Sequence, residues 1–121
     1  MPSLIYVVDD EKIIATTLAL ILEQNGFEAV AFTDPFDVLL AAERRRPDIL
    51  ISDVMMPPLN GVDLGVQFKA IHPTCKVLLF SGQAATTDLL KNARISGHTF
   101  ELLSKPIHPV DLISAVKEMV S

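Results

Sequence analysis

The sequence predicts a doubly wound α/β domain, in which one sheet of five parallel strands lies between two layers of helices. Two observations carry this prediction of a (βα)5 three-layer sandwich. A stretch of helical length follows each of five short apolar runs, which begin near Leu4, Phe27, Ile49, Val77 and Phe100. This alternation is the pattern of βα units on a parallel sheet. The chain has 121 residues, a common length for one domain, and we expect a single domain over residues 1–121.

The strands differ in composition, and the difference predicts their order in the sheet. Three runs are uninterrupted and apolar, as strands covered on both faces should be: residues 4–8, 49–51 and 77–80. The other two carry an acid, Glu28 in residues 27–32 and Glu101 in residues 100–103, which suits strands at the edges of a sheet. With the strands numbered along the chain, these assignments fit the doubly wound order 2-1-3-4-5.

Five helices follow from apolar residues spaced three or four apart. Their expected apolar faces are Ile14, Leu18, Ile21 and Leu22 in the first; Val38, Leu39 and Ala42 in the second; Leu64, Phe68 and Ile71 in the third; Leu89, Leu90 and Ala93 in the fourth; and Leu112, Ile113, Val116, Met119 and Val120 in the fifth. Asn25-Gly26 ends the first helix, and Asp34-Pro35 opens the second as an N-cap with proline at the first helical position. The fourth helix, over residues 86–96, has the weakest apolar stripe, so we expect it to be lightly anchored.

Composition excludes several classes of protein. Half of the residues are hydrophobic (50%), too many for a disordered acidic tail. The 15 acidic and 10 basic side chains give a net charge of −5, which argues against direct binding of nucleic acid. A single cysteine, Cys75, excludes an intrachain disulfide and a zinc site built on thiolate pairs. No apolar run is long enough to cross a bilayer and the N-terminus lacks a secretion signal, so we expect a soluble cytoplasmic domain without membrane contact.

Polar side chains stand at the carboxyl ends of four predicted strands. They are Asp9 and Asp10 after the first strand, Asp53 after the third, Ser81 after the fourth and Lys105 after the fifth. In a parallel sheet these ends share one edge, and doubly wound sheets bind ligands there, at the switch point between strands one and three. We therefore expect three carboxylates, one hydroxyl and one ammonium to converge.

Such a group of side chains indicates a particular chemistry. Three carboxylates repel one another unless a cation or protons intervene, and an oxygen-only cluster suits Mg²⁺. A lysine and a hydroxyl can contact an anion that arrives at the metal, which is what phosphoryl transfer needs from a protein. The alternative is that the acids only end strands and cap helices. That explanation serves for one aspartate but poorly for residues at four strand ends together.

These residues lie in a pattern that resembles the receiver domain of two-component response regulators, which has a chemotaxis-regulator-like, flavodoxin-like fold. The resemblance covers essentially the whole chain. It rests on the acidic pair after the first strand, on the segment Asp53-x-Met55-Met56-Pro57 followed by Gly61, and on the late pair Lys105-Pro106.

The resemblance implies that Asp53 is the phosphoacceptor. As a nucleophile it would take a phosphoryl group from the phosphohistidine of a sensor histidine kinase or a phosphotransfer protein. It further implies a Mg²⁺ ion held by Asp9, Asp10, Asp53 and the backbone carbonyl of Met55. The domain would then be a signalling module of a phosphorelay, which catalyses only its own phosphorylation and dephosphorylation and switches a surface for an unknown downstream effector.

Two further roles, and one departure, concern the end of the chain. The resemblance implies that Lys105 pairs with the phosphoryl oxygens, that Ser81 donates a hydrogen bond to them, and that a cis peptide bond precedes Pro106. The family often has an aromatic residue three positions before its lysine, where this chain has Leu102. Phe100 has the same strand parity and is either a displaced substitute or part of the core, and we favour the core.

Three other functions fit these residues less well. An aspartate-nucleophile phosphatase would need a second acid two residues after Asp53, where Met55 stands. A flavin-binding module would need a phosphate loop after the first strand, where Asp9 and Asp10 would repel phosphate, and no organic cofactor is expected. A non-phosphorylated pseudo-receiver, acting only as an interaction module, is disfavoured because all the site residues are present.

Overall fold

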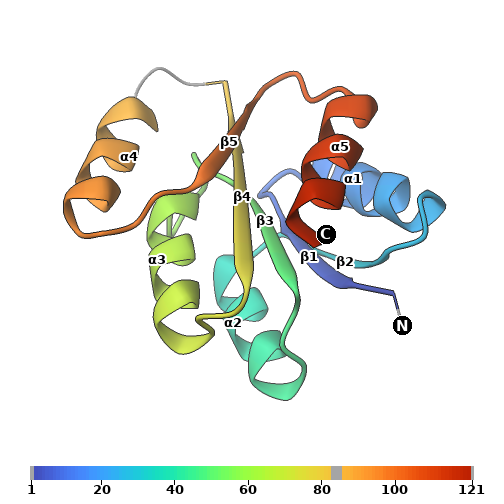
Figure 1. Ribbon diagram of the computed structural model, residues 1–121, viewed down its shortest axis with the longest axis horizontal. Coiled ribbons are helices and arrows are strands. Elements are labelled where there is room, and N and C mark those ends of the chain that lie inside the picture. The colour runs from blue at the N-terminus through green and yellow to red at the C-terminus, as the bar shows by residue number, and fades with distance from the viewer. Residues whose placement is uncertain (1, 83–85, 121) are drawn as a thin grey trace.

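The computed structural model describes residues 2–82 and 86–120, and it confirms the predicted fold class. One parallel sheet has the order β2-β1-β3-β4-β5 (Figure 1). Its strands are β1 Leu4–Val8, β2 Glu28–Phe32, β3 Ile49–Asp53, β4 Lys76–Ser81 and β5 Glu101–Ser104. The helices are α1 Lys12–Gln24, α2 Pro35–Arg44, α3 Gly61–Ile71, α4 Thr86–Ile95 and α5 Pro109–Val120. The two acid-bearing strands lie at the edges, as their composition predicts.

Helices cover both faces of the sheet. Helices α1 and α5 lie together on one face, and α2, α3 and α4 lie on the other (Figure 1). Each face has its own apolar cluster, because alternate residues of the central strands point to opposite sides. Ile5 and Val7 join the cluster under α1 and α5, whereas Leu4, Tyr6 and Val8 join the cluster under the other helices. The sheet is therefore buried on both faces, and its side chains meet solvent only at its edges and strand ends.

The predicted helix signals act locally as expected. The side chain of Asp34 accepts a hydrogen bond from the Phe36 N–H at 2.8 Å, and Pro35 follows as the first residue of α2. Asn25 caps the end of α1, and Gly26 next to it has a φ of 90°, a left-handed conformation that favours glycine. These caps set the helix bounds and thereby the places where the chain returns to the sheet.

Two residues predicted on apolar helix faces are exposed instead. The exposed fraction is 61% for Ile71 and 42% for Val120. Each is the last residue of its helix, so the apolar spacing continues to a position where no neighbouring element covers the side chain. In α4, Ala93 is buried and Leu89 and Leu90 are half-buried. Within the described ranges, no helix is both long enough and apolar enough to span a bilayer.

Candidate functional site

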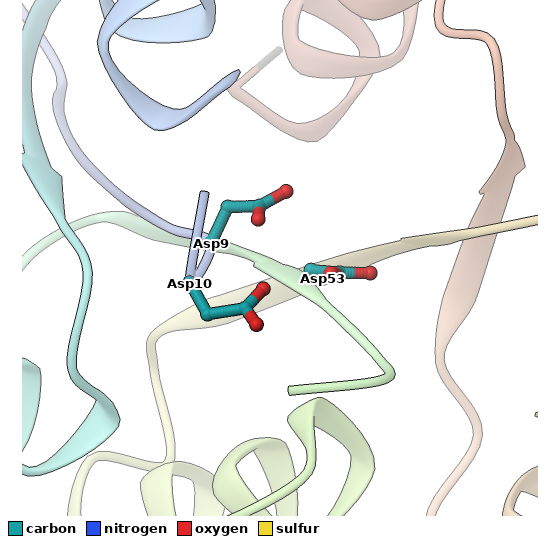
Figure 2. A group of neighbouring side chains, drawn as sticks. All are labelled: Asp9, Asp10 and Asp53. Atoms are coloured by element: carbon teal, nitrogen blue, oxygen red, sulfur yellow. The ribbon is translucent and has the colours of Figure 1, made fainter. Parts of the chain in front are cut away.

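Three carboxylates meet at the carboxyl edge of the sheet. Asp9 and Asp10 directly follow β1, Asp53 is the last residue of β3, and Figure 2 shows their side chains together at this edge. One carboxylate oxygen from each lies within 4.8 Å of the other two. The strands are neighbours whose pairing ends at Val8 and Ser52, so the fold brings together acids that are far apart in the sequence. This is the convergence that the strand-end pattern predicts.

Asp9 is the most deeply buried of the three carboxylates. Its Oδ1 accepts a hydrogen bond from the Glu11 N–H at 2.8 Å. Its Oδ2 is also buried, and within the part of the chain that the structure describes it has no hydrogen-bond partner. Burial raises the pKa of Asp9 to about 6; the Glu11 N–H lowers it and the charge of Asp53 raises it.

Asp53 is buried too, and burial raises the pKa of its carboxyl. The ammonium of Lys105 and the backbone N–H of Met55 act in the opposite direction, while the charge of Asp10 raises the pKa further. Two neighbouring carboxyls therefore resist ionisation for the same main reason, which is burial, and in each case the charge of another carboxylate adds to it. Three carboxylates and one buried oxygen without a donor are a donor set that fits a hard divalent cation such as Mg²⁺.

Lys105 supplies positive charge to the cluster. Its Nζ lies 3.4 Å from Oδ1 of Asp53 and 3.8 Å from Oδ2 of Asp9. The ammonium also lies over the ring of Phe80, 5.3 Å from the ring centroid. The peptide bond between Lys105 and Pro106 is cis, which confirms that prediction. One lysine offsets only one of the three negative charges.

Ser81 ends β4 beside these groups and is buried. Backbone hydrogen bonds link the strand ends here. The Val54 N–H donates to the Phe80 carbonyl and the Lys105 N–H donates to the Ser81 carbonyl, both at 3.1 Å. The structure thus places Ser81 at the same edge as Asp53, between the ends of β3 and β5. The roles of the Ser81 hydroxyl and of the Met55 carbonyl stay predictions.

The start of α3 lies directly against the backbone of Asp53. A Cβ atom on Gly61 would lie 2.1 Å from the Asp53 carbonyl oxygen, so only glycine fits there. The Ser52 hydroxyl donates a hydrogen bond to the same carbonyl oxygen at 2.8 Å. The side chain of Asn60 caps α3 by accepting from the Asp63 N–H. The contact of Ser52 was missed from the sequence, although a polar residue next to the acceptor in a buried apolar strand is a usable signal.

The aromatic side chain near the end of the chain belongs to the core. Phe100 packs against the apolar cluster under α3, where its Cζ would lie 3.1 Å from a Cβ on Gly65. Leu102, at the position where the family often has an aromatic residue, is 42% exposed. Because β5 begins at Glu101, Phe100 precedes the strand. The interpretation of Phe100 as core is therefore the one that the packing supports.

An apolar groove of about 510 Å³ borders the site. It runs between α1 and the segment that follows β5, and its lining includes Ile13, Ile14, Pro106 and Ile107. Lys105 lines the groove as well, so this one residue connects the groove to the carboxylate cluster.

The chain is similar to known proteins in sequence and in fold. Residues 5–117 match the family model of the response regulator receiver domain. The transcriptional regulatory protein CreB of Escherichia coli is 31% identical over 116 residues, which are 96% of this chain and 50% of that protein. The DNA-binding transcriptional regulator NtrC of Salmonella typhimurium is 31% identical over 121 residues, which are 98% of this chain and 25% of NtrC. The chain thus spans half or less of the length of these curated relatives.

Solved structures agree with the sequence relatives. A response regulator receiver domain protein from Clostridium thermocellum superposes with a TM-score of 0.86 at 28% identity, over 98% of this chain and 94% of that chain. The chemotaxis protein CheY4 of Vibrio cholerae has the same fold, with a TM-score of 0.84 at 22% identity over 98% and 99% of the two chains. The match to the family covers nearly the whole chain, and the fold agrees throughout. The chain therefore belongs to the response regulator receiver domain family, a family of signalling proteins.

Proposed function

We propose that this chain is a phosphoacceptor signalling domain of a two-component phosphorelay, with Asp53 as the acceptor. The observation that carries the proposal is the setting of the Asp53 carboxylate. It is buried, lies 3.4 Å from the Lys105 ammonium and shares a cluster with Asp9 and Asp10. This arrangement supplies a nucleophile, a positive group for the phosphoryl oxygens and a donor set for a metal ion.

The proposed reaction is a transfer between two residues. A carboxylate oxygen of Asp53 attacks the phosphorus of a phosphohistidine, and a phosphorus–oxygen bond forms. The phosphorus–nitrogen bond breaks, its electron pair returns to the imidazole, and the imidazole takes up a proton. Lys105 contacts the phosphoryl oxygens throughout, and the Ser81 hydroxyl donates a hydrogen bond to one of them. Attack by water on the same phosphorus later releases inorganic phosphate and restores the carboxylate, so the domain catalyses reactions of its own side chain only.

Mg²⁺ fits the carboxylate cluster as a resident ion. Asp9, Asp10, Asp53 and the backbone carbonyl of Met55 would hold it, and the buried Oδ2 of Asp9 is an oxygen that this role would use. When bound, the ion supplies positive charge that offsets the carboxylates and the phosphoryl oxygens.

The proposal names its partners by chemistry. The donor is a sensor histidine kinase or a phosphotransfer protein, whose surface we place over the apolar groove because Lys105 lines both the groove and the acceptor site. The phosphorylated state would change a surface that a downstream effector contacts. Residues 1–121 would act as one cytoplasmic domain, and a net charge of −5 disfavours direct contact with nucleic acid.

The test of the proposal is chemical modification of Asp53. The protein is incubated with Mg²⁺ and acetyl phosphate, and mass spectrometry looks for one added phosphoryl group on Asp53. Asp53→Asn should abolish the modification. Asp37→Asn, which changes an exposed aspartate on α2, should leave it intact. An unmodified wild-type protein, or undiminished modification in Asp53→Asn, would contradict the proposal and favour a pseudo-receiver.

A further inference from the structure

Ser52 is a polar residue in a strand that is otherwise built from apolar side chains up to the acceptor. It lies in β3 between Ile51 and Asp53 and is 0% exposed. Burial of a hydroxyl is unfavourable unless a hydrogen bond compensates for the lost water. The Ser52 hydroxyl forms that bond to the carbonyl oxygen of Asp53 at 2.8 Å. The carbonyl group of Asp53 thus supplies the hydrogen-bond acceptor that makes a buried serine acceptable at this position.

The bond lies where the sheet no longer holds the acceptor from both sides. The ladder between β1 and β3 ends at the pair Val8 and Ser52, so Asp53 lies one residue past its last partner on β1. On β4 the ladder continues to the pair Asp53 and Phe80. A side-chain bond to the Asp53 carbonyl therefore restrains the peptide group at the point where strand pairing becomes one-sided.

The first residue of helix α3 packs closely against the same peptide group. A Cβ on Gly61 would lie 2.1 Å from the Asp53 carbonyl oxygen and 2.8 Å from the Ser52 Oγ. The Gly61 N–H donates to the Val54 carbonyl at 2.8 Å. The backbone of Asp53 is thereby held between the Ser52 hydroxyl and the first residue of α3.

We propose that Ser52 is a positioning residue for phosphoryl acceptance, an inference that rests on the proposed function. The hydroxyl fixes the orientation of the Asp53 peptide group, and the direction of the Asp53 carboxylate follows from it. In-line attack depends strongly on such geometry, because a displacement of about 1 Å can lower a rate by about 100-fold. Ser52 acts through Asp53 and does not itself contact the phosphoryl group.

The experiment compares single variants in phosphorylation by acetyl phosphate, with donor and Mg²⁺ concentrations varied separately. For Ser52→Ala we expect the maximal rate to fall by about tenfold or more, while the half-saturating concentrations of both change less than about twofold. Ser52→Thr retains the hydroxyl and should restore most of the maximal rate. Ile49→Val, a cavity-forming change at the other end of the same strand, is the matched control and should leave both parameters unchanged.

The outcomes separate this inference from the proposed function. A wild-type protein that takes no phosphoryl group overturns both. Normal wild-type phosphorylation with an unchanged maximal rate in Ser52→Ala overturns the positioning role alone, and so does an equal loss in Ile49→Val. If Ser52→Ala does not fold, Ser52→Cys decides, since its thiol has a similar volume but is a weak donor; a rate equal to that of the wild type would contradict the role.

Discussion

Asp9 holds a carboxylate where an ionised group is unfavourable. Its side chain is buried and its Oδ2 is without a hydrogen-bond partner among the described residues. Burial raises its pKa to about 6, and the charge of Asp53 adds to the effect. A side chain that only ended a strand would gain nothing from this setting. The cost of keeping the charge is understandable if the carboxylate serves a ligand, and it has a measurable effect on stability.

We expect the free energy of unfolding to fall between about pH 5 and pH 7 in the absence of divalent cations. The raised pKa of Asp9 means that the folded state binds a proton which the unfolded state has already released in this range, so the stabilisation present at low pH is lost as the pH rises through about 6. Asp9→Asn should remove the effect and increase stability at pH 7 on the order of 1 kcal/mol, allowing for solvent screening. Urea unfolding of both proteins across this range provides the measurement.

The difference between the two pH profiles isolates the contribution of Asp9, because the two proteins differ at this residue alone. Parallel profiles would mean that Asp9 is ionised in the fold at no cost in stability and that the carboxylate cluster is not electrostatically unfavourable.

At the scale of elements, α3 connects the acceptor to the beginning of β5. Gly61 and Gly65 lie one helical turn apart. The first lies against the Asp53 carbonyl, and the second lies against the ring of Phe100 and the side chain of Val77. Two glycines on one face allow the helix to approach the sheet closely at both positions. A rearrangement at Asp53 that moved α3 would therefore also press on Phe100, without involving the exposed Leu102.

We expect Gly65→Ala and Phe100→Ala to be coupled. Alanine improves helix propensity by about 1 kcal/mol, but in the wild type its Cβ would lie 3.1 Å from the Phe100 ring. In the Phe100→Ala background that crowding is reduced, so Gly65→Ala should stabilise the protein more, by about 0.5–1 kcal/mol. Urea unfolding of the four proteins of the double-mutant cycle measures the coupling.

The control cycle pairs Gly65→Ala with Phe36→Ala. Phe36 is an exposed aromatic residue on α2 and does not provide any of the three atoms nearest to a Cβ on Gly65, so the two changes should be additive. Additivity in the Phe100 cycle as well would contradict the packing argument.

Much of the architecture at this scale follows from local pattern. The apolar runs predict the strands, and Asp34-Pro35 and Asn25-Gly26 predict helix ends that the structure confirms. The pattern fails at Ile71 and Val120 because periodicity records spacing, whereas burial depends on which neighbour covers a side chain.

Some features of the site can likewise be predicted from the sequence, and others cannot. The carboxylates and Lys105 are predictable because parallel strands end at one edge of a sheet, and each strand end can be recognised separately. The contact of Phe100 with Gly65 and the bond of Ser52 to its neighbour's carbonyl depend on the distance between a helix and the sheet. That distance is set by packing in three dimensions and leaves no regular spacing in the sequence.

At the scale of the whole molecule, stability and the site are linked through charge. The chain carries a net charge of −5, and three of its carboxylates lie together at one edge of the sheet. A cation that binds only where these acids are assembled binds the folded state and stabilises it. The donor set of the site therefore predicts a property of the entire domain.

We expect Mg²⁺ to raise the melting temperature. At a concentration ten times the dissociation constant, binding to the folded state alone contributes about 1.4 kcal/mol, which corresponds to a rise of roughly 5 °C for a domain of this size. Calorimetry with and without Mg²⁺ at matched ionic strength is the measurement. Asp10→Asn should lose most of the rise and Asp37→Asn should keep it; an equal rise in Asp10→Asn would indicate a general salt effect.

The order of the strands has a consequence for how the domain could be damaged. Asp9 and Asp10, Asp53 and Lys105 come from separate thirds of the chain and meet only when β1, β3, β4 and β5 are assembled in one sheet. A proteolytic fragment that retains Asp53 but loses either end of the chain has lost the acids or the lysine. Under the proposed function, such a fragment would take no phosphoryl group. The modification would report an intact, folded molecule each time it occurs.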